Sequence, residues 1–345
     1  MIKSRIHSYI VGSRFFLSKR DDILCLANHL QYQVIDQSLD GQVKIREVSF
    51  LKKETKKTIS ARHVSQFESI FSCPVCDSNM TVEALQRLVC VNNHSFDFAK
   101  QGYLNLIKHT SLTKYTKDLF ESRQKLMNDA GFFRPVTDII IKTIERAFQE
   151  VEGPILMLDS GSGEGSHIAY LRRSLQSDFG IEADGVGIDI SKEAITVAAK
   201  YYPELIWVVA DLAKTPFKDQ QFDLILNLLS PSNYTEFDRL LKSDGMVIKV
   251  VPGSDYLQEL RGEFFADSDK QTYSNHETVE LFKNHYQFVE QVIVNEMVRL
   301  DQSAMEWLLE MTPLTWNVPK DELKCFIEAD FTEITLDVVI LIGKN

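Results

Sequence analysis

The chain has 345 residues, enough for one large domain with one or two small ones. Its net charge is −11, and it contains no run of 18 apolar residues, which excludes a predicted transmembrane helix and a membrane partner. Five cysteines without a disulfide framework, and an N-terminus without a signal peptide's apolar core, predict a protein of the reducing cytoplasm.

The charge is distributed unevenly along the chain. Residues 1–125 carry 19 Lys and Arg against 12 Asp and Glu, whereas residues 126–345 carry 19 against 37. Because clustered basic residues attract phosphates, the N-terminal third is the part suited to nucleic acid. The alternative, a basic surface that is merely solvated, stays open.

Residues 1–66 are basic and weakly patterned. Asp40-Gly41, flanked by Tyr32–Ile35 and Val43–Val48, predicts a β-hairpin. The polar run 52–60 resembles a linker. No recognisable chemistry lies here, so a small accessory domain and an extension without function are equally compatible with residues 1–66.

Residues 67–115 contain a predicted metal site. Cys73 and Cys76 are two residues apart, and Cys90 and His94 follow as a second pair. Zn²⁺ prefers a tetrahedron of thiolate and imidazole ligands, so four such residues predict a closed, structural zinc knuckle without a catalytic water. The alternative is that these residues are unrelated buried or free thiols. The other two cysteines, Cys25 and Cys325, are isolated and are most simply interpreted as reduced side chains.

Aromatic residues follow the knuckle. Phe96 and Phe98 are expected to form its small core, whereas Tyr103, near Lys100 and Lys108, is open to either packing or stacking on RNA. A helix is expected over residues 117–130, ending at Gly131.

From about residue 134, strand and helix patterns alternate. The predicted strands are 155–158, 185–190, 206–210, 222–229 and 246–251, and the predicted helices among them are 164–176 and 192–201. This alternation predicts an α/β fold, a mostly parallel Rossmann-like sheet with helices on both faces. Residues 288–300 and 334–342 are expected to close it as an antiparallel pair at its edge.

A glycine-rich turn follows the first predicted strand. Asp159 ends that strand, and Gly161, Gly163 and Gly165 let the backbone approach a ligand at the start of the next helix. A dinucleotide fingerprint is the alternative, but it requires G-x-G-x-x-G, and the spacing here is G-x-G-x-G.

Two more aspartates end the next two strands. Asp189 is placed to bind ribose hydroxyls, and Asp211 is placed near an adenine amino group. Each aspartate alone fits a helix cap equally well. Three at successive strand ends, together with the glycines, predict a nucleotide-like ligand.

These motifs resemble S-adenosylmethionine-dependent class I methyltransferases. The segment from Cys73 to Leu106, D-A-G-F-F at 129–133, L-L-S-P-S-N-Y-T-E-F at 228–237 and M-T-P-L at 311–314 resemble the bacterial 23S rRNA (guanine-N1)-methyltransferases. The resemblance covers residues 70–345 and is nearer to the Gram-positive branch, which includes members linked to macrolide resistance and so to antibiotic resistance. Residues 1–66 have no counterpart in it.

The resemblance implies a methyltransferase domain over residues 116–345 with S-adenosylmethionine as cofactor. It implies these cofactor-binding residues: Phe133, Asp159, Gly161, Gly163, Glu164, Gly165, Asp189, Ile190, Asp211, Leu212 and Tyr256. Three positions depart from the family: Ser162 where Cys or another small residue is frequent, Phe133 where Tyr is usual, and Tyr256 where His is usual. The last change places the contact at Tyr256 in question.

The implied reaction is direct transfer of a methyl group to guanine N1 in a hairpin loop of 23S rRNA. Asn227, Ser230 and Pro231 follow the fourth strand and are candidates for the target-base pocket, while the proton acceptor stays unassigned. A homodimer is left open by the resemblance. Two other functions remain as alternatives: a small-molecule methyltransferase, and an RNA-binding relative without catalytic activity.

Overall fold

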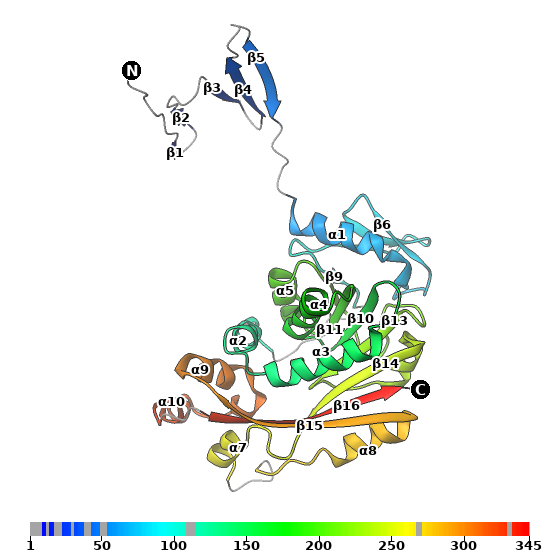
Figure 1. The fold of residues 1–345 in the computed structure, drawn as a ribbon, viewed down its shortest axis with the longest axis vertical. Helices are drawn as coiled ribbons and strands as arrows, with labels where there is room; N and C mark the ends of the chain where they lie inside the picture. The colour runs from blue at the N-terminus through cyan, green and yellow to red at the C-terminus, as the bar shows by residue number, and fades with distance from the viewer. Residues whose placement is uncertain are drawn as a thin grey trace. The chain divides into compact units, whose positions relative to one another are not determined.

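A computed structural model describes residues 9–11, 14–16, 23–28, 31–37, 43–48, 54–107, 115–266, 271–329 and 333–344. The chain divides into two compact units, Met1–Glu54 and Thr55–Asn345 (Figure 1). Within the described ranges, no helix combines the length and the apolar character needed to span a membrane.

The first unit contains short antiparallel strands. Strands β1 (Tyr9–Val11) and β2 (Arg14–Phe16) form one pair. A second sheet is formed by β3 (Ile23–Asn28), β4 (Gln31–Gln37) and β5 (Val43–Val48). The β4–β5 pair confirms the two strands of the expected hairpin, and its turn at Asp40-Gly41 lies outside the described residues.

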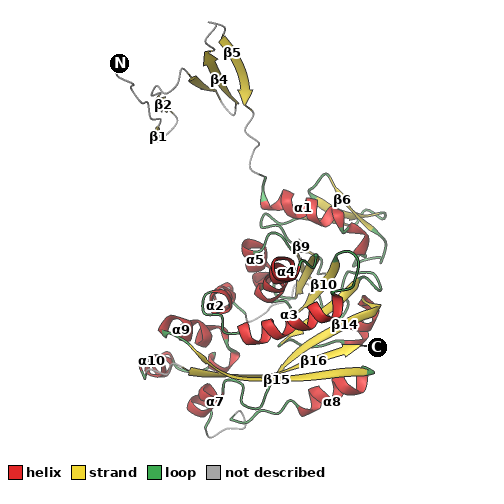
Figure 2. Ribbon diagram, viewed as in Figure 1, coloured by secondary structure: helices red, strands yellow, loops and turns green. Residues whose placement is uncertain are grey.

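A β-sheet forms the centre of the second unit (Figure 2). It has eight strands in the order β15-β16-β14-β13-β10-β11-β12-β9. Its strands are β9 (Leu104–Asn105), β10 (Ile155–Ser160), β11 (Ala183–Asp189), β12 (Ile206–Val209), β13 (Phe222–Leu228), β14 (Leu241–Pro252), β15 (Phe288–Arg299) and β16 (Glu333–Lys344). Strands β9 to β14 pair in parallel, and β16 runs antiparallel to both β14 and β15. The predicted parallel sheet with an antiparallel edge is confirmed.

The two faces of the sheet pack against different layers. Ile155 and Met157 of β10 belong to a core with α3 (Arg134–Phe148), α4 (Ser166–Phe179) and α5 (Lys192–Tyr201). The intervening Leu156 and Leu158 point to the opposite face, as expected for alternation along a strand. There they pack with α1 (Lys56–Gln66), α6 (Tyr234–Leu240), α8 (His276–His285) and the ribbon that contains the cysteines.

That ribbon comprises residues 68–97. It begins with the 3₁₀ turn η1 (Glu68–Ile70), continues through Cys73 and Cys76, and ends in a three-stranded antiparallel sheet of β6 (Met80–Glu83), β7 (Arg87–Cys90) and β8 (Ser95–Asp97). Phe98 is buried and Phe96 is partly buried in the same core, which confirms the small core expected for them. Tyr103 is buried too, in the core of the other sheet face, so it packs instead of stacking on RNA. Lys108 lies outside the described residues.

Two boundaries in the structure differ from those expected from the sequence. The run 52–60, which was expected to be a linker, contains the start of α1, because Thr55 caps the helix by accepting from the Thr58 amide. This helix buries Ala61 and Val64, so the compact unit begins at Thr55 and not near residue 67. Leu104–Asn105, expected within the knuckle segment, pairs with β12 as an edge strand of the large sheet.

The remaining helices are α2 (Lys117–Asn128), α7 (Gln258–Phe264), α9 (Gln302–Met311) and α10 (Lys320–Glu328), with a 3₁₀ turn η2 (Pro313–Thr315). Helix α2 ends two residues earlier than expected. It packs against α9, α5 and α4, which places it next to the carboxyl ends of β10 and β11.

Candidate active site and metal centre

The four predicted metal ligands lie together in the ribbon. The Nδ1 atom of His94 lies 3.5 Å from the sulfur of Cys73, 3.3 Å from that of Cys76 and 3.4 Å from that of Cys90. The sulfurs of Cys76 and Cys90 are 3.7 Å apart, and all four atoms lie within 4.8 Å of one another. Ligands about 2.0–2.3 Å from a tetrahedral Zn²⁺ are separated by about 3.5–3.8 Å, so the cluster fits zinc.

Two turns with positive φ shape this cluster. Asp77 (φ 56°) follows the first ligand pair, and Asn93 (φ 63°) precedes His94. The Ser78 hydroxyl and the Asn92 amide lie 3.2 Å and 3.3 Å from the Cys76 sulfur, and these hydrogen bonds lower the pKa of Cys76 to about 5. The ribbon therefore favours the thiolate, which is the form that binds metal.

The ribbon is joined to the catalytic sheet through its backbone. The Ser72 amide donates to the Pro216 carbonyl at 2.9 Å, and the Lys218 amide donates to the Ile70 carbonyl at 2.8 Å. Between these bonds the rings of Phe71 and Phe217 lie 5.4 Å apart, both buried. Metal centre and large sheet therefore share one core.

The glycine-rich turn lies at the carboxyl end of β10. The amides of Gly161 and Ser162 both donate to the Ile188 carbonyl at 2.9 Å, and Gly161, Gly163 and Gly165 all have positive φ. A Cβ on Gly161 would lie 1.9 Å from the Ser230 hydroxyl, and one on Gly165 would lie 2.1 Å from the ring of Trp207. Two of the three glycines thus permit close packing inside the protein, a role that their spacing did not reveal.

Polar groups without partners are buried beside this turn. Asp159 Oδ2, Ser162 Oγ, Glu164 Oε1 and both ring nitrogens of His167 have no hydrogen-bond partner among the described residues. Burial raises the pKa of Asp159 to about 8 and lowers the pKa of His167 to about 3. Because buried polar groups are normally satisfied, this cluster fits a polar ligand such as the amino-acid end of S-adenosylmethionine.

Sequence reasoning missed Arg123 at this site. Its Nε lies 2.9 Å from Glu164 Oε2, and its guanidinium carbon lies 3.7 Å from the position of a Cβ on Gly163. Arg123 belongs to α2, which comes before β10 in the chain, so neither a motif nor a strand end identifies it. Helix α2 lies over the glycine-rich turn and brings a positive charge to it.

The other predicted aspartates differ in their surroundings. Asp189 accepts from the amides of Ser191 at 2.8 Å and Gly163 at 2.9 Å, so its carboxylate links the glycine-rich turn to Ser191, the residue that caps α5. Burial raises the pKa of Asp189 against these hydrogen bonds. Asp211 is exposed and accepts from the Ala213 amide, and Ile190 beside it is 38% exposed. Leu212 is partly buried.

Phe133 and Tyr256 are both buried. The Phe133 ring lies edge-on to His167, with centroids 5.4 Å apart, which places it next to the unsatisfied polar groups. Burial raises the pKa of Tyr256 to about 12, and the nearby charge of Arg123 opposes this shift. Phe133 therefore lies beside His167, and Tyr256 lies near Arg123.

The three candidates for the target-base pocket do not play one role. Asn227 is fully buried, and its amide is used within the protein. Pro231 lines a pocket of about 550 Å³ together with Leu212, Asn233, Tyr234 and His285. Asn227 therefore lies beneath the loop and supports it, whereas Pro231 faces open space.

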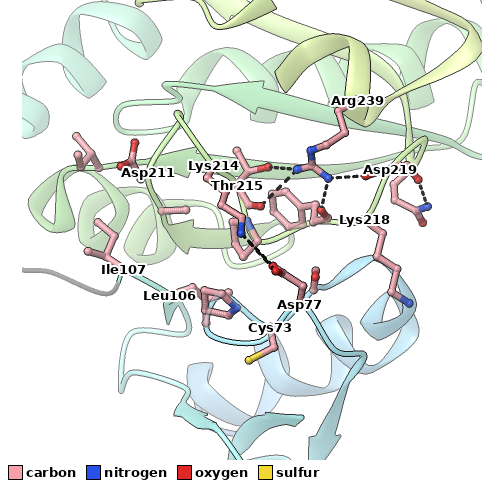
Figure 3. Close-up of a pocket in the computed structure, with 17 residues that line it drawn as sticks. Cys73, Asp77, Leu106, Ile107, Asp211, Lys214, Thr215, Lys218, Asp219 and Arg239 are labelled. Atoms are coloured by element: carbon pink, nitrogen blue, oxygen red, sulfur yellow. Dashed lines mark hydrogen bonds and ion pairs between the residues drawn. The ribbon is translucent and has the colours of Figure 1, made fainter. Parts of the chain in front are cut away.

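A larger pocket of about 950 Å³ lies between ribbon and catalytic domain (Figure 3). Cys73, Pro74 and Asp77 line it from the ribbon, and Asp211 and Lys214 line it from the loop after β12. Lys214 Nζ lies 3.2 Å from an Asp77 oxygen across the pocket, but both side chains are mostly exposed, so this pair adds little stability. The loop 211–215 forms a wall shared with the smaller pocket, because Leu212 and Ala213 line that one.

Comparison with known proteins agrees with both parts of this arrangement. A family model described as RlmA, N-terminal, matches residues 71–109, and one described as a methyltransferase domain matches residues 157–245. YxjB of Bacillus subtilis, named a putative 23S rRNA (guanine-N(1)-)-methyltransferase, is 46% identical over 279 residues, which are 80% of this chain and 98% of YxjB.

A second relative is more distant. The 23S rRNA (guanine(748)-N(1))-methyltransferase of Streptomyces fradiae is 30% identical over 79% of this chain and 95% of its own length. Identity at this level over most of both chains, with a Cys3His ribbon in front of a methyltransferase sheet, establishes the family. The chain belongs to the RlmA-type family of S-adenosylmethionine-dependent 23S rRNA guanine-N1 methyltransferases.

Proposed function

We propose that this protein transfers the methyl group of S-adenosylmethionine to N1 of a guanine in a hairpin loop of 23S rRNA. The observation that carries the proposal is the cluster of unsatisfied buried polar groups at the carboxyl end of β10, next to a loop that borders an open pocket. Both relatives are named as 23S rRNA guanine-N1 methyltransferases, and this similarity supplies the substrate.

The cofactor would be held at three places. The glycine-rich turn, with Asp159 and Glu164, suits its amino-acid end, Asp189 suits its ribose, and Asp211 with Ile190 suits its adenine. Phe133 and Tyr256 close the site against water. Bound there, S-adenosylmethionine supplies an activated methyl group, and the chain's task is to orient donor and acceptor.

We propose that the RNA crosses from ribbon to catalytic domain over the two pockets. The larger pocket has Lys214 and Lys218 at its edge, and the ammonium group of Lys218 has no ion-pair partner among the described residues. Such groups suit RNA phosphates, while the target base would be splayed out toward Pro231 in the smaller pocket.

Primer extension tests this function. The protein is incubated with unmodified 23S rRNA and S-adenosylmethionine, and reverse transcriptase is then extended across the RNA. We expect one stop that requires both protein and cofactor, because N1 methylation blocks base pairing. Cofactor binding by calorimetry without any stop would favour a small-molecule substrate, and absence of cofactor binding would favour a relative without activity.

We also propose a homodimer. Edge strand β15 is twelve residues long, and Ile293 and Met297 on one of its faces are 64% and 63% exposed. A long edge strand with exposed apolar side chains favours pairing with a second chain. Light scattering should give twice the chain mass, reduced to one by Ile293→Lys with Met297→Lys. A monomer at micromolar concentration would contradict the proposal.

A further inference from the structure

Lys249 is a buried lysine at the carboxyl end of β14, opposite Asn227 in the register with β13. Its side chain is almost fully buried, and its Nζ donates to Asn227 Oδ1 at 2.6 Å and to the Ser230 carbonyl at 3.2 Å. No carboxylate in the described part of the chain pairs with this ammonium group, and burial lowers the pKa of Lys249 to about 8. A buried cation without a counter-ion costs free energy, so packing alone does not explain it.

The hydrogen bond from Lys249 helps to orient the Asn227 amide, whose Oδ1 also accepts from the Ser232 hydroxyl at 3.4 Å. With Oδ1 facing Lys249, the amide nitrogen donates to the Ser160 carbonyl and the Pro231 carbonyl, each at 3.0 Å. Ser160 leads into the glycine-rich turn, and Pro231 belongs to the loop proposed to present the target base. One side-chain amide therefore connects the cofactor side of the site to the target side.

The same loop is held in an unfavourable backbone conformation. Leu229 has φ 53°, in the left-handed region that side chains other than Gly, Asn and Asp rarely adopt. Its amide donates to the Val250 carbonyl at 2.9 Å, and Lys249 holds the carbonyl of the next residue, Ser230. Strain of this kind persists only where surrounding bonds fix it, and it concentrates at functional loops.

We propose that Lys249 is a positioning residue for methyl transfer. It fixes the Asn227 amide and the Ser230 carbonyl, so that the glycine-rich turn and the target-base loop stay at a constant distance from each other. This inference rests on the proposed methyl transfer. Loss of the bond would leave Asn227 Oδ1 with the Ser232 hydroxyl, 3.4 Å away, as its donor, and would loosen both the Asn227 amide and the Ser230 carbonyl. Since transfer requires donor and acceptor in line, such a displacement slows the chemical step more than it weakens cofactor binding.

The test compares two variants of the full chain in single-turnover methylation of 23S rRNA at saturating S-adenosylmethionine. Lys249→Met removes the donor, and we expect the rate to fall about 100-fold with cofactor affinity by calorimetry changed less than about twofold. Lys249→Gln keeps a neutral donor, so its rate should be about tenfold higher than that of Lys249→Met. Its pH–rate profile should run parallel to that of the unaltered protein, because an amide donates at every pH and the Lys249 amine donates with or without its extra proton.

A double-mutant cycle identifies Asn227 as the intermediary. If Lys249 acts through Asn227, adding Lys249→Met to Asn227→Ala should lower the rate by less than about threefold. Lys242→Met is the matched control, because Lys242 lies on the same strand, is partly exposed and pairs with Asp223 away from the loop. Its rate should equal that of the unaltered protein.

The outcomes separate the two proposals. If the unaltered protein transfers no methyl group to the rRNA, the proposed function fails. If it does and Lys249→Met is equally fast, only the inference on Lys249 fails. A pH profile of Lys249→Gln that changes shape would assign a proton-transfer role instead and also overturn positioning. If Lys249→Met loses cofactor binding, the rate of Lys249→Gln is used instead. A Lys249→Gln rate as low as that of Asn227→Ala contradicts the proposal. A Lys249→Gln rate within about tenfold of the unaltered protein supports it.

Discussion

At the scale of single residues, the proposed cofactor site combines ionisable groups that are buried away from water. Asp159, Glu164, Asp189 and Arg123 lie close enough for their charges to affect one another, and His167 is buried beside them. Such groups cost stability in the free protein. Their retention fits a site that is selected for binding a polar ligand.

Asp159→Asn should stabilise the free protein and weaken cofactor binding. Because burial raises the pKa of Asp159 from 3.8 to about 8, the folded state holds a proton that the unfolded state releases between these values. The free energy of unfolding therefore falls as pH rises through this window. Removal of the carboxyl should raise it by about 2–5 kcal/mol at pH 8 and change it little at pH 4. Denaturant unfolding at both pH values checks this.

Calorimetry supplies the second half of this prediction. S-adenosylmethionine should bind Asp159→Asn at least about tenfold more weakly. Asp178→Asn, at an exposed position near the end of α4, is the control and should match the unaltered protein in both measurements. Unchanged cofactor affinity in Asp159→Asn would remove this carboxylate from the site.

Gly187→Ala should destabilise the fold. A Cβ at this position of β11 would lie 2.1 Å from the Trp207 ring, which is fully buried and has no room to move. We expect a loss of about 3 kcal/mol in the free energy of unfolding. Gly262→Ala, in α7 with nothing within 4 Å, should be neutral or slightly stabilising. Equal stability of the two variants would contradict the packing described here.

At the scale of elements, the ribbon takes the place of a covering layer on one face of the sheet. Its residues and α1 share a core with β10 to β14, and backbone bonds at Ser72 and Lys218 fix the contact. The metal centre therefore stabilises a part of the catalytic domain's surface as well as its own turn.

Cys73→Ser should release zinc and weaken RNA binding more than cofactor binding. The remaining three ligands leave the tetrahedron incomplete, and the ribbon's side of the larger pocket loses its shape, while the glycine-rich turn lies elsewhere. Metal content by mass spectrometry and RNA affinity by anisotropy check this. Cys325→Ser, at an exposed thiol, is the control. Full RNA affinity after zinc loss would show that the ribbon does not hold the RNA.

At the scale of the whole molecule, the chain consists of a small β-rich unit and a catalytic unit that contains the ribbon, the proposed cofactor site and both pockets. The family models match residues within the second unit only. The segments that match the family models therefore all lie in the catalytic unit.

Removal of residues 1–54 should leave methyl transfer intact. Thr55 begins α1 and caps it, so a protein of Thr55–Asn345 keeps the helix that packs against the ribbon. We expect its single-turnover rate to lie within about twofold of the full chain's. A second truncation that starts at residue 67 removes α1 and should lower the unfolding temperature. A large loss of rate in the first truncation would assign the N-terminal unit a role in the reaction.

The sequence alone determined the features that depend on local pattern. Cys73, Cys76, Cys90 and His94 predicted the metal centre, because two pairs with short spacing have few other uses, and alternating apolar runs predicted the sheet and its antiparallel edge. The glycines and aspartates were expected to meet at one edge of the sheet, because the carboxyl ends of parallel strands lie there, and this edge is the proposed cofactor site.

Only the tertiary structure decided which residues complete that site and what each one does. Arg123 pairs with Glu164 from helix α2, which is not part of the strand and helix alternation that predicted the fold. Lys249 and Asn227 lie on neighbouring strands and are 22 positions apart in the chain. Neither has a local signal, since each depends on contacts between segments that the chain brings together only by folding. The same reason hid the role of Gly165, which makes room for Trp207, and the helix that begins within an apparent linker at Thr55.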